Sequence, residues 1–261
     1  MMKTIGTFPF GQQVQEVAQT DRTSKVVFVL GVYASAVHAR WTNKDGRILV
    51  RALAVASEPY IFWRGENADS IICTIEIPDG LGKLLPAEPT FNGPSGIALD
   101  NLILNPLGLE RKEVWLCDLV PHSSMNPPQK RAIEREYLPI VPKYGLPKAT
   151  VPPLTNPITD EIRRNEIENE ILDSNARILI LLGDLPIRWF LSYFDNRWDK
   201  LSDFEPYGHL HNTRIRNKEM KILPLAHPRQ IARLGQSSEK WYEAHTRWIH
   251  QSAKNISQSF I

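Results

Sequence analysis

Short, mostly apolar runs recur along the chain and alternate with longer segments of helical spacing. The runs lie at residues 26–30, 47–56, 114–120, 177–182 and 218–225. Runs of this length that are rich in Val, Ile and Leu are typical of strands covered on both faces, as in parallel sheets. The alternation therefore predicts an α/β fold, a three-layer α/β/α arrangement around a mostly parallel central sheet.

Segments between the runs place apolar residues three and four positions apart, as helices do. The clearest of them, residues 97–107, is followed by Gly108, the residue type preferred just beyond a helix end. Residues 35–41 are expected to begin a helix or to form a wrapped loop. Further helices are predicted within residues 128–137, 160–173, 185–194 and 237–252.

The chain is expected to form one domain over residues 1–261, because no clear linker separates its first and last apolar runs. Residues 1–22, rich in Gln and Thr, are expected to be a surface arm, and residues 237–261 a C-terminal helix and tail. Trp241, His245 and Trp248 share one face of that helix. Such a stripe indicates core packing rather than a cofactor site.

Composition excludes little about partners and more about location. A net charge of +2 does not require a nucleic-acid partner, although a local basic face could still bind one. No stretch approaches the roughly 20 apolar residues of a membrane span. The first ten residues show no cationic segment followed by an apolar one, so no signal peptide is expected. The expected compartment is the cytoplasm, with no membrane partner.

Cysteines and histidines give no sign of a metal centre. Cys73 and Cys117, the two cysteines, lie in apolar strand-like runs and are expected to be buried, reduced thiols rather than a disulfide. An iron–sulfur cluster needs four ligands, so this set excludes one. His209 and His211 have a spacing that could bind a metal, but no third ligand lies near them, and two solvated rings are favoured. No cofactor is expected.

Polar residues gather where three of the apolar runs end or pause, and in a glycine-rich turn that precedes the helix predicted at residues 97–107. The carboxyl ends of parallel strands form the ligand crevice of an open sheet, so these positions are the candidate site. They lie in the segments Gly31-Val32-Tyr33-Ala34-Ser35, Phe91-Asn92-Gly93-Pro94-Ser95-Gly96, Cys117-Asp118 and Ala226-His227-Pro228-Arg229.

The order and spacing of these segments resemble the uracil-DNA glycosylase superfamily, most closely its thermostable, iron–sulfur-containing branch, from residue 26 to about residue 234. The resemblance implies a uracil-DNA glycosylase-like fold with a pocket for a nucleobase extruded from DNA. By position, Phe91 would stack on the base, Asp118 would read its edge, and His227 would support negative charge on the departing base. The resemblance also implies substrate-binding roles for Gly31, Ser35, Gly93, Ser95, Gly96 and Arg229, with phosphates held at the helix amino end and by Arg229.

Two residues depart from the family's pattern. Tyr33 stands where the family carries a residue that activates or positions water, and a phenol at neutral pH is a poor base. Ala34 replaces the proline that usually follows. Asp118 stands where the family usually has asparagine, and an ionised carboxylate can only accept hydrogen bonds, so it would repel the carbonyl edge of uracil.

Three interpretations of Asp118 remain open from the residues alone. It could stay protonated in a desolvated pocket and pair with an amidine-like base edge. It could instead be ionised and activate water in place of Tyr33. It could also be a structural acid that caps a loop or pairs with arginine.

Other polar residues could line the same pocket. His38 and Arg40 could reach the pocket rim or lie on the surface, and His122, Ser123 and Ser124 could form the pocket wall.

Three functions are compatible with this pattern. The first is a divergent glycosylase that binds an extruded nucleobase and hydrolyses an N-glycosidic bond without strict selectivity for uracil. The second is a catalytically degenerate module of the same fold that binds nucleic acid or a partner protein. The third is a hydrolase acting on a free nucleoside, with Asp118 as its base.

Overall fold

The computed structural model describes residues 5–235 and 238–260, which form two compact units. Unit 1 comprises the described part of Met1–Val17 with Tyr33–Pro94 and Val120–Thr155; unit 2 comprises Ala18–Val32, Ser95–Leu119 and the described part of Asn156–Ile261. Residues 1–4 of the expected arm and residues 237 and 261 of the expected C-terminal segment lie outside the described residues. The assignment of the whole chain to one domain stays a prediction.

Unit 2 is built around a five-stranded sheet with the order β5-β1-β6-β8-β7. Strand β1 pairs in parallel with β6, and β6 pairs in parallel with β8, whereas the edge strand β7 runs antiparallel to β8. Every residue of β5 and of β6 is buried, as expected for strands covered on both faces. This sheet confirms the predicted α/β class. Its strands are β1 (Val27–Tyr33), β5 (Val114–Val120), β6 (Ile178–Leu182), β7 (His211–Ile215) and β8 (Lys218–Leu225).

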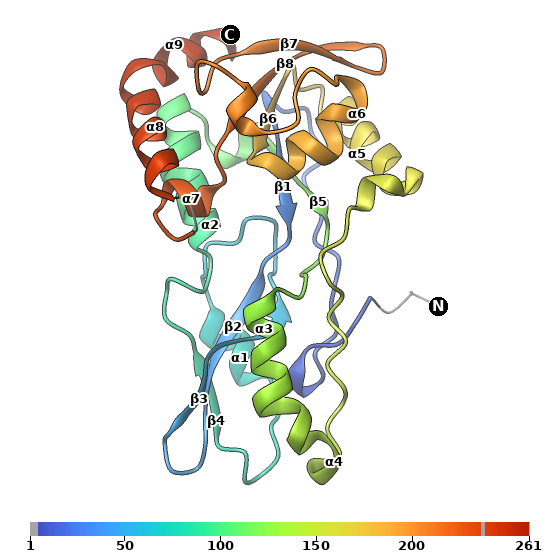
Figure 1. Ribbon diagram of the computed structural model, residues 1–261, viewed down its shortest axis with the longest axis vertical. Coiled ribbons are helices and arrows are strands. Elements are labelled where there is room, and N and C mark those ends of the chain that lie inside the picture. Colours follow the sequence, from blue (N-terminus) through green and yellow to red (C-terminus); the bar gives the residue numbers. More distant parts are fainter. Residues whose placement is uncertain (1–4, 236–237, 261) are drawn as a thin grey trace. The chain divides into compact units, whose positions relative to one another are not determined.

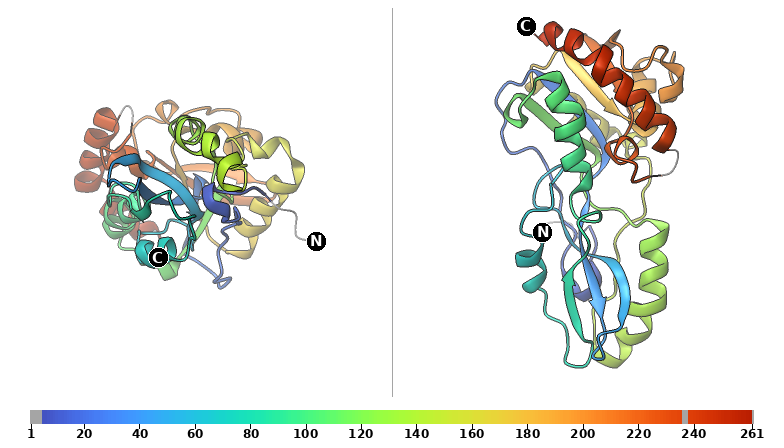
Figure 2. Two further views of the ribbon diagram at one scale, coloured as in Figure 1. Left: turned by 90° about the horizontal axis from the view of Figure 1, so that it is seen from below. Right: turned by 90° about the vertical axis from the view of Figure 1, so that its left-hand side faces the viewer.

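Helices flank both faces of this sheet (Figures 1 and 2). The longest are α5 (Glu161–Asp173), which Asp160 caps through its side chain, and α8 (Ser238–Gln251), which carries the buried His245 and Trp248. Both confirm helices predicted from spacing. The other helical segments are η4 (Arg111–Glu113), η7 (Pro157–Thr159), η8 (Pro186–Leu191), α6 (Ser192–Phe194), η9 (Leu201–Asp203), α7 (Pro228–Ile231), α9 (Ala253–Ser257) and η10 (Gln258–Phe260).

The helix predicted after the glycine-rich turn is also present, although it is not a regular α-helix. It begins as α2 (Pro94–Ala98), continues as the π-helical η2 (Leu99–Leu104) and ends as the 3-10 segment η3 (Asn105–Leu107). Gly108 follows with φ of 69°, the left-handed geometry that lets glycine end a helix without steric cost.

Unit 1 holds a second sheet that the sequence reading did not anticipate. Its order is β3-β2-β4, and both pairings are antiparallel. The strands are β2 (Ala36–Thr42), β3 (Ile48–Ser57) and β4 (Lys83–Pro86). The expectation of a helix or loop at residues 35–41 is therefore wrong. Buried Val37, Ala39 and Trp41 alternate with the more exposed His38 and Arg40, which is the two-residue period of a strand.

The segment expected to be a surface arm contributes to the core of unit 1 instead. Phe8 is fully buried, and the main-chain N–H of Phe10 donates to the hydroxyl of Tyr137 at 3.0 Å. The arm interpretation is wrong for this part, because two phenylalanines in a polar stretch supply enough apolar surface to hold it on the core. The helical segments of unit 1 are η1 (Pro9–Gly11), α1 (Ala68–Cys73), α3 (Pro127–Ala132), η5 (Ile133–Tyr137), η6 (Leu138–Ile140) and α4 (Val141–Tyr144).

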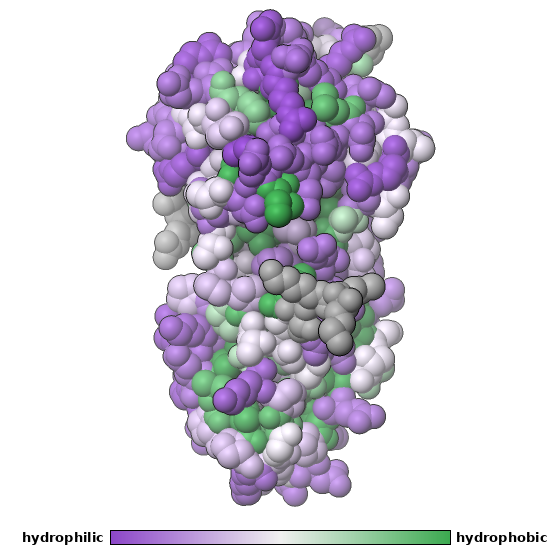
Figure 3. Space-filling model, turned by 90° about the vertical axis from the view of Figure 1, so that its right-hand side faces the viewer, coloured by the Kyte–Doolittle hydropathy of each residue, from purple (hydrophilic) through white to green (hydrophobic). Residues whose placement is uncertain are grey.

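Hydrophilic side chains dominate the face of unit 2 drawn in the upper part of Figure 3, with isolated hydrophobic residues between them. Among the described helices, none is long and apolar enough to cross a membrane. The cytoplasmic location expected from the sequence stays a prediction.

Candidate functional site

The candidate site in unit 2 lies at the carboxyl edge of its parallel strands. Asp118 lies near the end of β5, Gly183 follows β6, and His227 lies two residues beyond β8. Strands β1 and β6 separate β5 from β8, so three steps of about 4.8 Å place the outer two roughly 14 Å apart.

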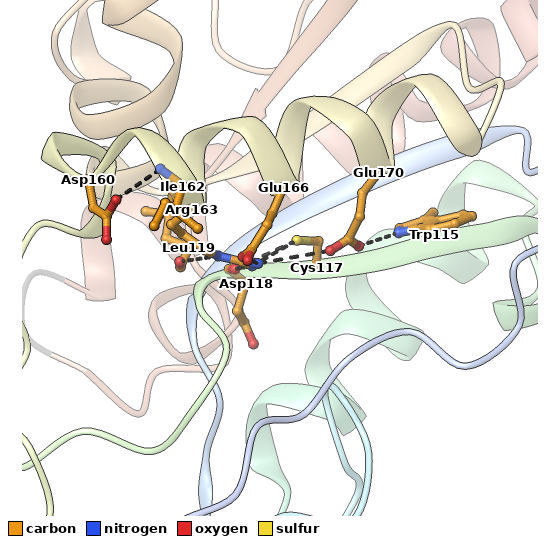
Figure 4. A network of polar contacts seen from close by, with 9 residues as sticks. All are labelled: Trp115, Cys117, Asp118, Leu119, Asp160, Ile162, Arg163, Glu166 and Glu170. Atoms are coloured by element: carbon orange, nitrogen blue, oxygen red, sulfur yellow. Dashed lines mark hydrogen bonds and ion pairs between the residues drawn. The ribbon is translucent and has the colours of Figure 1, made fainter. Parts of the chain in front are cut away.

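Asp118 turns its carboxyl away from helix α5 (Figure 4). Alternation along β5 places Cys117 on the α5 side and Asp118 on the other side. Only 4% of Asp118 is exposed, and within the described part of the chain its carboxyl group makes no hydrogen bond. Burial raises the pKa of Asp118 to about 7, against a smaller lowering by the charge of Arg163. A partly protonated acid at neutral pH is the result.

Arg163 of α5 anchors this end of β5 through the main chain rather than through the Asp118 carboxyl. Its guanidinium donates to the carbonyl oxygens of Asp118 and, at 3.0 Å, of Leu119. It also lies 3.5 Å from Sγ of Cys117 and forms an ion pair with Glu166 at 3.0 Å. The interpretation of Asp118 as an acid paired with arginine does not fit these contacts.

His227 is held in one tautomer by its own loop. The main-chain N–H of Arg229 donates to Nδ1 of His227 at 3.2 Å, so Nδ1 is an acceptor and the ring proton is on Nε2. Burial, with the nearby charge of Arg229, lowers the pKa of His227 to about 4. The ring is therefore neutral at pH 7 and offers Nε2–H as a hydrogen-bond donor.

Gly31, Ser95, Gly96 and Arg229 are the other predicted site residues of unit 2. Gly31 is within β1, since that strand continues to Tyr33 instead of opening into a loop at the glycine. Ser95 and Gly96 lie in the first turn of α2. The guanidinium of Arg229 donates to the carbonyl oxygen of Leu234 at 3.2 Å, so part of its hydrogen-bonding capacity closes its own loop. Their roles in ligand binding stay predictions.

Four of the predicted site residues belong to unit 1: Tyr33, Ser35, Phe91 and Gly93. Ser35 accepts a hydrogen bond from the Ser123 hydroxyl at its carbonyl oxygen, at 2.5 Å. Phe91 and Tyr33 are partly buried. The structure brings Asp118 and His227 to one sheet edge of unit 2. A pocket that these two share with the four residues of unit 1 stays a prediction.

Gly93 has a structural role that accounts for its presence without a ligand. Its φ is 73°, and a Cβ atom there would lie 2.0 Å from the carbonyl carbon of Arg64. Gly65 mirrors it, because a Cβ there would lie 2.5 Å from the carbonyl oxygen of Asn92. The side chain of Asn92 binds both the N–H and the C=O of His38, at 2.8 and 3.0 Å. This turn is thus fixed within unit 1 by direct main-chain approach.

The cysteine and histidine expectations are only partly met. Both thiols are free, and Cys117 is buried, but Cys73 is exposed at the end of α1 because that segment forms a helix rather than a strand. His211 is not freely solvated: its ring packs against Trp198 and Phe204, and burial lowers its pKa. Across residues 5–235 and 238–260, no group of three or more His, Cys, Asp or Glu side chains is arranged to hold a metal ion.

Two residues beside His227 were missed by the sequence reading. Gly183, with φ of 88°, comes so close that a Cβ atom there would lie 3.4 Å from Cβ of His227. The hydroxyl of Tyr207 accepts a hydrogen bond from the N–H of Ala226 at 3.0 Å. A glycine directly after a buried strand was a usable signal for Gly183, whereas nothing in the sequence around Tyr207 indicates its contact.

These observations define an α/β protein whose candidate ligand-binding residues lie at the carboxyl edge of a mostly parallel sheet. A family model described as the Uracil DNA glycosylase superfamily matches residues 88–248, more than half of the chain, and the chain belongs to this superfamily. The matched range includes Phe91, Asp118 and His227 and begins after Gly31, Tyr33 and Ser35. No curated protein matches the chain.

Proposed function

We propose that this protein binds a nucleobase extruded from DNA at the carboxyl edge of the unit 2 sheet and hydrolyses its N-glycosidic bond. The observation that carries the proposal is the presence at one edge of a buried acid without a hydrogen-bonded partner, Asp118, and a neutral imidazole donor, His227. Membership of the superfamily supports the choice of a glycosidic substrate.

His227 would act as the charge-stabilising donor. When the bond between C1′ and the base nitrogen breaks, its electron pair moves onto the base, and negative charge develops on a carbonyl oxygen. A neutral Nε2–H placed at that oxygen stabilises the charge without having to lose its proton. Water adds to C1′ and releases a proton, which the departing base anion takes up, so that C1′–OH and the neutral base are formed. Removal of one such preorganised donor typically lowers a rate by roughly 10²–10³-fold.

Asp118 would read the edge of the base. In its protonated form the carboxyl donates one hydrogen bond and accepts another, which matches an edge with a carbonyl oxygen beside an N–H. Uracil, hypoxanthine and xanthine all present such an edge, so strict selectivity for uracil is not expected. If Asp118 reads the base edge, Asp118→Asn should keep activity, because an amide can also donate one hydrogen bond and accept another. If the ionised acid instead activates water, Asp118→Asn should lose activity, because an amide cannot act as a base.

A second candidate function is binding of nucleic acid without hydrolysis. The presence of Tyr33 where the family carries a residue that handles water favours this alternative. It predicts salt-sensitive binding, because phosphate contacts release counterions, with no cleaved product.

The test uses labelled single-stranded and duplex oligonucleotides carrying uracil, hypoxanthine or xanthine, with alkaline cleavage of any abasic site. His227→Ala removes the donor, and His250→Ala, an exposed histidine on α8, is the matched control. We expect product with the full-length protein and with the His250 variant, and a loss of about 100-fold or more with His227→Ala. Absence of product from every substrate rules out hydrolysis, and salt-sensitive binding in the same samples then supports the second candidate.

A further inference from the structure

A chain of hydrogen bonds within unit 2 leads to the segment that carries His227. The N–H of Ala226 donates to the hydroxyl oxygen of Tyr207 at 3.0 Å. That hydroxyl lies 2.7 Å from Nδ1 of His245, and Nε2 of His245 lies 2.7 Å from the carbonyl oxygen of Leu102. Helix α8 and the segment η2 are thereby connected to the residue just before His227. The right-hand view of Figure 2 shows these two helical segments side by side.

The donor and the acceptor of each hydrogen bond in this chain follow from the groups at its two ends, the carbonyl oxygen of Leu102 and the N–H of Ala226. The carbonyl oxygen of Leu102 can only accept, so Nε2 of His245 carries the ring proton and Nδ1 is an acceptor. Tyr207 must then donate its hydroxyl proton to Nδ1, and its oxygen accepts the N–H of Ala226. Burial lowers the pKa of His245 to about 4 and raises the pKa of Tyr207, so both groups stay neutral over the ordinary pH range.

Two further contacts show that this region is closely packed. The indole N–H of Trp248 donates to the carbonyl oxygen of Gly208 at 2.9 Å, and a Cβ atom on Gly208 would lie 2.4 Å from the Trp248 ring. On the other side of the His227 segment, the N–H of Gly183 donates to the carbonyl oxygen of Leu225 at 2.8 Å. The backbone at Leu225 and Ala226 is therefore held by Gly183, which follows β6, and by Tyr207, whose hydroxyl contacts His245 of α8.

We infer that Tyr207 and His245 are positioning residues that fix the His227 backbone, and through it the direction in which Nε2–H points. His227 is bound on its Nδ1 side only by the N–H of Arg229, two residues further along the same short loop. This loop contact sets the tautomer only while the ring lies within reach of the Arg229 N–H, and the external contacts at Ala226 and Leu225 hold the ring there. Only one part of the inference rests on the proposed function, namely that the Nε2–H of His227 is directed at the departing base.

The test reads the state of His227 directly, by NMR of the full-length protein labelled with ¹⁵N in histidine. Long-range nitrogen–proton correlations distinguish Nδ1–H from Nε2–H, and comparison with His227→Gln assigns the signals. In the unsubstituted protein we expect Nε2–H for both His227 and His245 between pH 5.5 and 8. Detection of the Nδ1–H form for His245 contradicts the proton order of the chain and overturns the inference without any positioning variant.

Tyr207→Phe then removes the hydroxyl, and Tyr242→Phe is the matched control. Tyr242 is on α8, like His245, but its ring lies against the guanidinium of Arg233, and its hydroxyl belongs to no hydrogen bond of the described residues. With Tyr207→Phe we expect His227 to show a mixture of tautomers and its pKa to rise by about one unit as water reaches the ring. Tyr242→Phe should leave both properties unchanged.

His245 provides a second pair of variants if Tyr207→Phe does not fold. His245→Leu leaves the Tyr207 hydroxyl without an acceptor and should reproduce the mixed tautomers, while His245→Gln offers an amide oxygen and should restore part of the single form. If folded variants keep the native His227 tautomer and pKa, the two residues only stabilise the fold and the inference is wrong.

Activity gives an independent readout that separates this inference from the proposed function. On an oligonucleotide that the unsubstituted protein cleaves, Tyr207→Phe should lower kcat about tenfold and change KM less than twofold, because misdirection of a donor acts on the transition state. If no substrate is cleaved, hydrolysis is ruled out, but the NMR result still decides whether Tyr207 and His245 position His227.

Discussion

The Arg163 guanidinium binds the main-chain carbonyl oxygen of Asp118, while the Asp118 carboxyl points to the opposite side of β5. Arg163 thus anchors the main chain at the end of β5 and forms no hydrogen bond with the carboxyl group. Because no opposite charge contacts the carboxyl directly, burial dominates its titration and raises its pKa to about 7. This arrangement gives the candidate site a group that changes protonation near neutral pH.

Asp118→Asn should change the pH dependence of stability. The folded state holds the proton of Asp118 up to about pH 7, whereas the ordinary value is 3.8, so between these pH values the folded state binds more protons and its stability falls as pH rises. The full effect of the shift is on the order of 4 kcal/mol. We expect Asp118→Asn to be more stable than the unsubstituted protein at pH 8 and to lose this advantage at pH 4.5, measured by urea unfolding. Asp173→Asn, at an exposed acid in the same unit, should show no such pH-dependent gain.

Binding of a base with adjacent carbonyl and N–H groups should weaken as pH rises through about 7. Protonated Asp118 donates to the carbonyl, and the ionised form cannot. His227 does not contribute to this transition, since its pKa of about 4 leaves it neutral throughout. Fluorescence anisotropy with a uracil oligonucleotide at fixed salt, from pH 5.5 to 8.5, should show a decline for the unsubstituted protein and a flat profile for Asp118→Asn. Parallel profiles for the two proteins would exclude Asp118 from the base edge.

Gly93→Ala should destabilise unit 1 far more than Gly46→Ala. Both glycines have positive φ, but a Cβ at Gly46 meets nothing within 4 Å, whereas one at Gly93 overlaps the main chain of Arg64. Left-handed geometry alone costs about 1–2 kcal/mol for alanine, and displacement of packed main chain costs at least about 2 kcal/mol more. Urea unfolding of the two variants separates the cost of the left-handed geometry from the cost of displacing the main chain. Equal losses would mean that the close approach of residues 64–65 and 92–93 is not maintained.

The two thiols should differ sharply in reactivity. Cys73 is exposed, whereas Cys117 is buried beside Arg163 and burial raises the pKa of its thiol, so little thiolate forms. Native protein should react with one equivalent of a maleimide, and Cys73→Ser should react with none until it is denatured. Mass spectrometry of the labelled protein gives the count. Rapid labelling of native Cys73→Ser would show that the carboxyl end of β5 opens in solution.

Local patterns were sufficient for most of the elements of unit 2. The buried runs became β1, β5, β6 and β8, and the helices α5 and α8 begin and end close to the predicted residues. They were predictable because a run of apolar residues covered on both faces, or a helix with one apolar face, carries its period in a few consecutive positions. The run at residues 47–56 became β3, whereas its antiparallel partner β2 was missed although Val37, Ala39 and Trp41 alternate with His38 and Arg40.

The sequence by itself determined the α/β class, the family and the two residue types, an acid at position 118 and a histidine before Pro228, on which the proposed chemistry depends. Only the tertiary structure decided what those groups are at neutral pH. Burial without a direct counter-ion keeps a proton on much of Asp118, and a contact with the N–H of Arg229 places the proton of His227 on Nε2. Protonation depends on the surroundings of a group in space, and residues such as Arg163, Tyr207 and His245 reach these positions from distant parts of the chain.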